Sequence, residues 1–328
     1  MQKGIKFRIY PNKEQQNLIN QTLGCCRLIY NKGLAMRNEA YQNGNKIGYS
    51  QTSAMLTDLK KSDDFAFLKA VDSIALQQSL RDLDRGFVNF FQKRASHPTF
   101  KSKHNHHQSY RTINQGDNIR IVGKYIKLPK LGFVKIRQTM GVEKINNVTI
   151  ERTPTNKYFA VLNVKFEPQP MSNKGGKIGI DVGIKEFYSD SNGNVVYNPK
   201  YLEKSMRKLI REQRKLSRKE KGSTNRNKQR VKVALVHEKI TNQRNDFLQK
   251  QSTMLIRENQ TICIEDLKVK NMMRNHKLAQ HIGSASWSKF FDMLSYKSIW
   301  YGNDIVKVPT MYPSTGGRCL PAGGALCR

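Results

Sequence analysis

The sequence is poor in acidic residues, in cysteine and in long apolar runs. Its 328 residues include 25 Asp and Glu against 58 Lys and Arg, a formal net charge of +33. No run approaches 18 apolar residues, and the start at Met1 has no apolar signal core, so we expect a cytoplasmic chain that does not contact a membrane. The five cysteines are too few and too scattered for a disulfide framework, and reduced, buried thiols are expected.

The excess of positive charge indicates the kind of partner. Hydrophobic residues make up 38% of the chain, which is enough for a real core and excludes a disordered basic tail. A folded protein that keeps this much self-repulsion needs a polyanion to offset it. Nucleic acid is therefore the expected partner.

Hydrophobic periodicity divides the chain into regions. Residues 4–10 alternate apolar and basic side chains, as a half-buried strand does, and Pro11 ends the run. Residues 11–95 carry apolar positions at helical spacing from Asn12 onward, and residues 96–170 return to a period of two. Ile5 to Ile9 could complete the sheet of that β segment. After Pro168 and Pro170 the pattern becomes α/β, and we place the main domain boundary there.

Two acids stand at the ends of predicted strands in the α/β region. Asp181 lies between Gly179 and Gly183 on one strand face, where the absent side chains leave room for a metal ion and a phosphate. Glu265 ends a second apolar run, 84 positions later. Carboxylates are the ligands that Mg²⁺ prefers, so the pair predicts a Mg²⁺ site in an RNase H-like sheet. The alternative is that each acid is only a solvated turn residue.

Between the two acids lies the densest positive charge. Residues 200–232 contain 14 Lys and Arg against 3 Glu. On a helical wheel, Leu202, Met206, Leu209 and Leu216 fall opposite the cations. One cation per turn, about 5.4 Å apart, suits a phosphate backbone, although a solvated face is the alternative. The predicted nucleic-acid-binding residues are Lys204, Arg207, Lys208, Arg211, Arg214, Lys215, Arg218 and Lys219. A long second helix follows, with apolar positions at Leu235, Ile240, Phe247, Leu248 and Leu255.

Several blocks, in order, resemble TnpB, the transposon-encoded RNA-guided DNA endonucleases related to type V CRISPR effectors. The resemblance covers roughly residues 1–314. The matching blocks are Lys6-Phe-Arg-Ile-Tyr-Pro with Glu14-Gln15, Leu128-Pro-Lys-Leu-Gly132, Gly179-Ile-Asp-Val-Gly183, Lys239-Ile-Thr-Asn-Gln-Arg-Asn-Asp-Phe247, Ile264-Glu-Asp-Leu267 with Asn271-Met272, and Tyr312-Pro-Ser-Thr315.

The resemblance implies a fold and partners for each region. It implies an α/β RuvC (RNase H-like) nuclease domain at 171–313, with a basic helical insertion at 200–260. It also implies a β-barrel-like, oligonucleotide-binding wedge at 1–10 and 96–170, with a helical recognition insertion at 11–95. The implied partners are a guide RNA from the transposon end and a double-stranded DNA target. Asp181 and Glu265 occupy the positions of that family's first two catalytic acids and would be its Mg²⁺ ligands.

The tail at 314–328 departs from the family. The family continues into a zinc ribbon with two Cys-x-x-Cys pairs and a helix bearing a third catalytic Asp. Here Cys319 and Cys327 are eight positions apart, so no zinc is expected. The tail holds four of the 22 glycines and no Lys, Asn, Ile, Asp or Glu. Its abrupt composition indicates an altered reading frame, with an evolved short tail as the alternative.

Three functional hypotheses follow. The first to be favoured is an RNA-guided DNA-binding protein of the TnpB type, with impaired cleavage because the third acid and the ribbon are missing. The second is an active endonuclease in which Asp292 or Asp304 substitutes for the third acid. The third is a basic nucleic-acid-binding or RNP protein without a guide. A further expectation is that Trp287, Phe290, Phe291 and Leu294 form core rather than a base-stacking surface.

Overall fold

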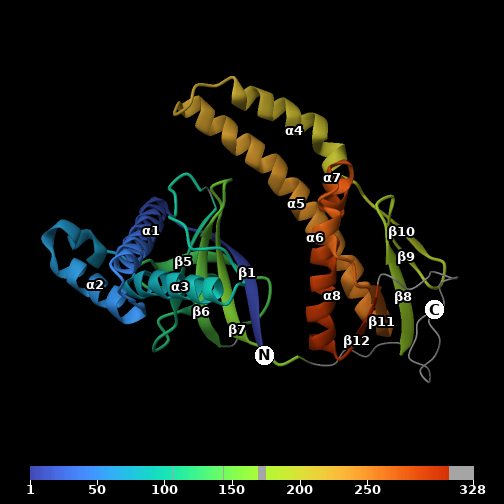
Figure 1. The fold of residues 1–328 in the computed structure, drawn as a ribbon, viewed down its shortest axis with the longest axis horizontal. Helices are drawn as coiled ribbons and strands as arrows, with labels where there is room; N and C mark the ends of the chain where they lie inside the picture. The colour runs from blue at the N-terminus through green and yellow to red at the C-terminus, as the bar shows by residue number, and fades with distance from the viewer. Residues whose placement is uncertain (106, 143, 169–174, 310–328) are drawn as a thin grey trace. The chain divides into compact units, whose positions relative to one another are not determined.

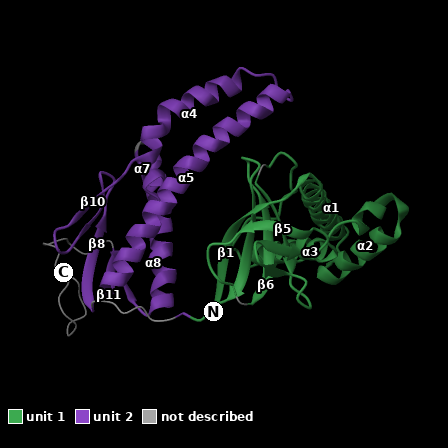
Figure 2. Cartoon of the chain, turned by 180° about the vertical axis from the view of Figure 1, so that it is seen from behind, with its two compact units in different colours: residues 1–167 green, residues 168–328 purple. Residues whose placement is uncertain are grey.

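The computed structural model describes residues 1–105, 107–142, 144–168 and 175–309. It divides into two compact units, Met1–Glu167 and Pro168–Arg328, which Figure 2 colours separately. The division falls beside Pro168, where the sequence pattern changes. Within the described ranges, no helix is long and apolar enough to cross a membrane.

A seven-stranded antiparallel sheet forms the base of the first unit, in the order β2-β6-β7-β1-β5-β4-β3. The first strand of the chain lies in its middle, pairing Phe7 with Ala160 of β7 and Ile9 with Ile136 of β5. The expected completion of the β segment by Ile5 to Ile9 is therefore confirmed. The strands are β1 (Gln2–Tyr10), β2 (Gln108–Ile113), β3 (Arg120–Val122), β4 (Tyr125–Leu128), β5 (Gly132–Arg137), β6 (Ile145–Arg152) and β7 (Tyr158–Lys165).

Helices follow β1 and pack on the inner face of this sheet (Figure 1). They are α1 (Lys13–Gln42), α2 (Tyr49–Lys61), the 3₁₀ helix η1 (Asp63–Lys69) and α3 (Ser73–Phe91). Asn12 caps α1 by accepting a hydrogen bond from the Gln15 amide, and the Gln15 side chain accepts one from the Asn12 amide. The Gln15 side-chain amide also donates to the carbonyls of Leu131 and Phe133. The cap thus ties the start of α1 to β5.

The second unit contains a five-stranded mixed sheet in the order β10-β9-β8-β11-β12. β8 (Gly176–Val182), β11 (Asn259–Glu265) and β12 (Asp304–Val308) run parallel, whereas β9 (Glu186–Asp190) and β10 (Val195–Tyr197) form antiparallel hairpins from β8. Two helical crossovers join the parallel strands: α4 (Tyr201–Ser217) with α5 (Thr224–Glu258), then α6 (Val269–Met272), α7 (His276–Ala285) and α8 (Trp287–Tyr301).

Helices α5 and α8 lie side by side over this sheet (Figure 1). The Phe187 ring centroid is 4.9 Å from those of Phe247 and Phe290, so strand β9 and both helices meet in one aromatic cluster. Trp287, Phe290 and Leu294 are buried, which confirms the core prediction for these three residues of α8, whereas Phe291 is only partly buried against the same cluster. Along α5, Leu235 is 44% exposed, whereas its neighbour Val236 is buried. This part of α5 packs against α4 through the cluster of Leu209, Val236 and Ile240.

A buried lysine joins α8 to α5. Lys297 donates hydrogen bonds from Nζ to the Gln249 carbonyl at 3.1 Å, to Ser252 Oγ at 2.8 Å and to Thr253 Oγ1 at 2.7 Å. All three acceptors are neutral, and burial lowers the Lys297 pKa to about 8. The folded chain therefore loses this proton at a lower pH than the unfolded chain does.

This shift predicts a pH-dependent free energy of unfolding. Between about pH 8 and pH 10 the unfolded state holds the Lys297 proton and the folded state does not, so stability rises with pH in that window. The measured quantity is the difference in the free energy of unfolding between the native chain and Lys297→Met, which isolates the contribution of this side chain. We expect Lys297→Met to be more stable than the native chain at pH 7.5, and this difference in the free energy of unfolding to become smaller by pH 9.5. Urea unfolding followed by tryptophan fluorescence checks this, and a constant gap would contradict it.

Candidate functional site

Asp181 and Glu265 lie on neighbouring parallel strands at the same edge of the second sheet. Ile180 of β8 pairs with Ile264 of β11, and each acid is the next residue along its strand. Because the two strands are parallel, their C-terminal ends lie at the same edge of the sheet, and Asp181 and Glu265 lie side by side there. Asp181 is exposed and Glu265 is partly buried. The structure thus brings together the two acids that the sequence placed 84 positions apart.

The carboxylates of Asp181 and Glu265 interact through their charges. Partial burial raises the pKa of Glu265, and the negative charge of Asp181 raises it further. A cation between the two carboxylates would relieve both effects.

The donor set fits one Mg²⁺ ion. Mg²⁺ commonly takes one or two carboxylates and completes its octahedral shell with water and substrate phosphate. Across the described ranges of the chain, no group of three or more His, Cys, Asp or Glu side chains is placed to hold a metal. The expectation that Gly183 leaves room for a metal ion and a phosphate is wrong, because a Cβ at Gly183 would approach the Glu186 carbonyl oxygen to 2.9 Å and the backbone that leads into β9 fills that space.

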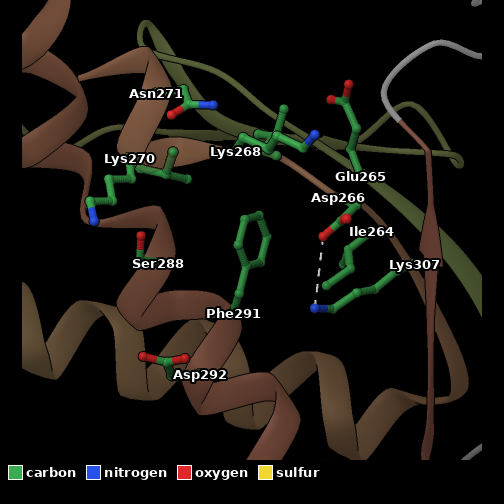
Figure 3. A pocket seen from close by; sticks show the side chains of 12 residues that line it. Ile264, Glu265, Asp266, Lys268, Lys270, Asn271, Ser288, Phe291, Asp292 and Lys307 are labelled. Carbon is green, nitrogen blue, oxygen red and sulfur yellow. Dashed lines mark ion pairs between the residues drawn. The ribbon is translucent and has the colours of Figure 1, made fainter. Parts of the chain in front are cut away.

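The two acids proposed as substitutes for a third ligand differ in position. Asp304 begins β12 and pairs with Thr261, whereas Val308 pairs with Glu265. Four residues of strand separate Asp304 from the site, about 13 Å, so the expectation for Asp304 is wrong. Asp292 lies on α8 and lines the same cavity as Glu265. Figure 3 shows Asp292 and the Glu265 carboxylate on different sides of the Phe291 ring.

A cavity of about 450 Å³ opens beside Glu265. Lys307 projects into this region and pairs with Asp266 at 3.8 Å (Figure 3). The Asp266 amide donates to the Val308 carbonyl at 2.8 Å, which holds the chain after Glu265 against β12. The other polar side chains that line the cavity are Lys268, Lys270, Asn271, Ser288 and Asp292. Sequence reasoning missed this group; the one signal was the lysines immediately after the acid-bearing strand.

The basic helix is the first arm of a helical hairpin, with α5 as the second (Figure 1). Leu209 turns toward Val236 and Ile240 of α5. Seven of the eight predicted cations are exposed: Lys204, Arg207, Lys208, Arg211, Arg214, Lys215 and Arg218. Helix α4 ends at Ser217, so Arg218 is its C-cap and Lys219 lies beyond it, half-buried. The helix therefore ends two residues earlier than the periodicity suggested, and a turn at Gly222 leads into the Ser223 cap of α5.

One acid partly balances this face. Glu212 is buried, and its Oε2 accepts a 2.7 Å hydrogen bond from the Gln229 side chain of α5. That hydrogen bond lowers the pKa of Glu212. Arg211 and Lys215 pair with the same carboxylate at 3.5 and 3.8 Å. The remaining cations of α4 keep the face strongly positive. The predictions made for Cys319, Cys327 and the tail at 314–328 lie outside the described residues.

Comparisons with known proteins agree on one family. Residues 154–276 match the family model OrfB_IS605, described as "Probable transposase". A protein of Streptomyces pristinaespiralis, described as "Putative RNA-guided DNA endonuclease", is 39% identical over 99% of this chain and 82% of its own length. The similarly described InsQ of Escherichia coli K12 is 33% identical over 97% of this chain and 83% of its own. The chain belongs to the TnpB family.

The TnpB assignment agrees with the fold. A solved Cas12f1 chain, from a complex with sgRNA and target DNA, superposes with a TM-score of 0.52 over 94% of this chain and 89% of that one. At 12% identity this likeness concerns the fold alone. Both acids and the basic hairpin fall inside the OrfB_IS605 match.

A second family model, described as "Helix-turn-helix domain", matches residues 1–46 of this TnpB chain. The structure describes all of those residues, and they form strand β1 and the single helix α1. No helix-turn-helix occurs in that described range. The match therefore marks family membership, and its name does not describe the local fold.

Proposed function

We propose that this chain is an RNA-guided DNA-binding protein of the TnpB type with a RuvC-like nuclease site that cleaves weakly. The observation that carries the proposal is the placement of Asp181 beside Glu265 at the ends of parallel strands. The exposed cations of α4, in the same unit, support a nucleic-acid substrate. The descriptions of the relatives as RNA-guided DNA endonucleases support the guide RNA and the DNA target.

In this proposal Asp181 and Glu265 hold Mg²⁺, which when bound supplies charge neutralisation at a scissile phosphate. The chain's own part is to hold the two carboxylates together at one edge of the sheet. Among the described residues, no third acid joins the pair. That is the basis for proposing weak cleavage. Base pairing with the guide would supply sequence specificity, while the wedge at 1–10 and 96–170 and the lobe at 11–95 would read duplex shape.

The alternatives are an active enzyme that recruits Asp292, and a basic RNA- or DNA-binding protein without a guide. Sequencing the RNA that copurifies with the chain separates the last of these from the proposal. A single discrete RNA species is expected. A broad mixture of cellular RNA would overturn the guided function.

The basic face of α4 yields a prediction about binding. Changing Arg207, Arg211 and Arg214 to Gln should weaken RNA and DNA binding for every sequence tested, because phosphate contacts carry no sequence information. The slope of log affinity against log salt should flatten by roughly 0.7–0.9 for each lost phosphate contact. Fluorescence anisotropy titrations at several salt concentrations measure both quantities.

A matched control removes three exposed cations from other elements. Arg257, Arg274 and Lys289 are exposed in the second unit outside α4, and their change to Gln lowers the net charge equally. We expect a smaller change in slope for this control. An equal change in both variants would assign the effect to overall charge and the α4 face to solvent.

A further inference from the structure

Strand β9 contains a β-bulge beside the acid pair. Val196 of β10 pairs with Tyr188, but the next residue, Tyr197, pairs with Glu186, so β9 has one residue more than β10 between these pairs. The extra residue is Phe187. Phe187 and Tyr188 are both buried in the aromatic cluster, although a regular strand would turn two adjacent side chains to opposite faces. Bulges beside functional sites commonly redirect a side chain in this way.

The bulge brings Glu186 and Tyr197 to the face of the sheet that carries the acids. Asp181 pairs with Ser189 of β9, and cross-strand partners share a face. Ser189 Oγ donates a 3.3 Å hydrogen bond to Glu186 Oε2, so the Glu186 side chain lies on that face too. Tyr197 is the cross-strand partner of Glu186. It therefore lies on the acid face, on the side of Asp181 away from Glu265.

The ring of Tyr197 is exposed at this position. It is 67% exposed, whereas the neighbouring Val196 packs against the core. Val195, which strand alternation places on the same face as Tyr197, is 40% exposed. An exposed ring and an exposed valine thus form a small apolar surface beside the two carboxylates.

The distance from this surface to the acids suits a neighbouring nucleotide. Adjacent strands are about 4.8 Å apart, so the backbone of Tyr197 lies about 10 Å across the sheet from that of Asp181. The tyrosine side chain covers part of that distance. A DNA strand with one phosphate at the acid pair therefore has a nearby base within reach of the ring.

We infer that the Tyr197 ring stacks on an unpaired base of the DNA strand that is cut, and so positions a phosphate of that strand at Asp181 and Glu265. The inference rests on the proposed function, in which pairing with the guide displaces one DNA strand as a single strand. Aromatic rings stack on every kind of base. The bases of a duplex already stack on one another, so Tyr197 favours a single strand without adding a sequence preference.

The first test compares cleavage by three single variants of the full chain, loaded with guide RNA. Tyr197→Ala should cut matched DNA at least about tenfold more slowly than the native chain, because the base loses its stacking partner. Tyr197→Phe keeps the ring and should cut within twofold of the native rate. The control Ile299→Ala removes an apolar side chain of the same unit that is 63% exposed on α8, and its rate should also stay within twofold.

The second test detects stacking without cleavage. 2-Aminopurine loses fluorescence when it stacks, and it is placed at successive positions of the displaced DNA strand. The protein is Asp181→Ala, which leaves the strand intact. One position should be quenched more strongly than its neighbours. That quenching should disappear when Tyr197→Ala is added and persist when Tyr197→Phe is added.

Three results would overturn the inference. The first is a cleavage rate of Tyr197→Ala within twofold of the native rate. The second is a slower rate with no quenched position that depends on Tyr197, which would give the ring a structural role only. The third is quenching by Tyr197 of 2-aminopurine in the guide RNA and not in the DNA.

A gel shift with guide RNA and matched DNA separates this inference from the proposed function. If the complex forms and no 2-aminopurine position depends on Tyr197, the inference fails and the guided function stands. If no complex forms, the guided function fails. The quenching of a single-stranded 2-aminopurine DNA on the chain without guide then decides whether Tyr197 stacks on a base.

Discussion

A polypeptide of these 328 residues, supplied with its guide RNA and Mg²⁺, should bind matched DNA but cut it at least about a thousandfold more slowly than a version extended by the family's zinc ribbon and final helix. Two-metal cleavage stabilises both the attacking and the leaving oxygen of the phosphate. Asp181 and Glu265 supply enough carboxylate ligands to hold one Mg²⁺ ion, whereas two-metal cleavage needs ligands for two. A factor of a thousand corresponds to about 4 kcal/mol of lost transition-state stabilisation.

The positions of the other acids support this expectation. Asp304 pairs with Thr261 at the start of β12, whereas Glu265 pairs with Val308 at its end. Asp266 is paired with Lys307. Asp292 lines the cavity from α8 but does not join the two acids in a three-residue cluster among the described residues.

The assay is a plasmid-cleavage time course, with a gel shift on the same preparation. The variant Asp181→Ala gives the background level of cleavage. Asp304→Ala serves as the matched control, because it removes an acid of the same sheet that lies away from the site. Cleavage clearly above the Asp181→Ala level, and abolished by Asp292→Ala, would establish Asp292 as the third acid. The weak-cleavage proposal would then be dropped. Equal gel shifts throughout would show that binding does not depend on the acids.

Much of this architecture was predictable because local patterns carry it. The alternation of Ile5, Phe7 and Ile9 predicts β1, and Asn12 predicts the start of α1. The apolar runs that end in Asp181 and Glu265 predict two strands with terminal carboxylates. Neither apolar run, however, predicts which strand it pairs with. The pairing of Ile180 with Ile264 forms only when the α4–α5 crossover returns the chain to the sheet.

Features built from distant segments could not be read from the sequence. The cavity beside Glu265 combines the end of β11, the start of α6, one face of α8 and Lys307 of β12. The central place of β1 in the first sheet, next to β5, is likewise not specified by alternation alone. Periodicity also does not settle which of two adjacent apolar residues of α5 is buried: Val236 is buried and Leu235 is 44% exposed. A one-position shift in a helix turns a side chain by about 100°, and periodicity does not reveal which partner helix it meets.

The aromatic cluster of the second unit should supply the largest single contribution to its stability. Phe290 is fully buried, with ring centroids of Phe187 at 4.9 Å and Tyr188 at 6.1 Å. Phe290→Ala removes the ring that joins α8 to β9 and leaves a cavity, so the free energy of unfolding should fall by about 3–5 kcal/mol. Phe291 is its neighbour in sequence but only partly buried, and Phe291→Ala should cost about 1 kcal/mol.

The pair forms a matched experiment, because both variants remove the same ring from the same helix. Both tryptophans of the chain, Trp287 and Trp300, lie on α8, so urea unfolding followed by tryptophan fluorescence reports on this unit. Since β9 is hydrogen-bonded to β8 beside Asp181, loosening the cluster should also weaken the hold on the acid pair. Equal losses for the two variants would mean that the ring of Phe290 has no special place in the core, and that α8 is held to the sheet by the remaining contacts of Trp287, Met293 and Leu294.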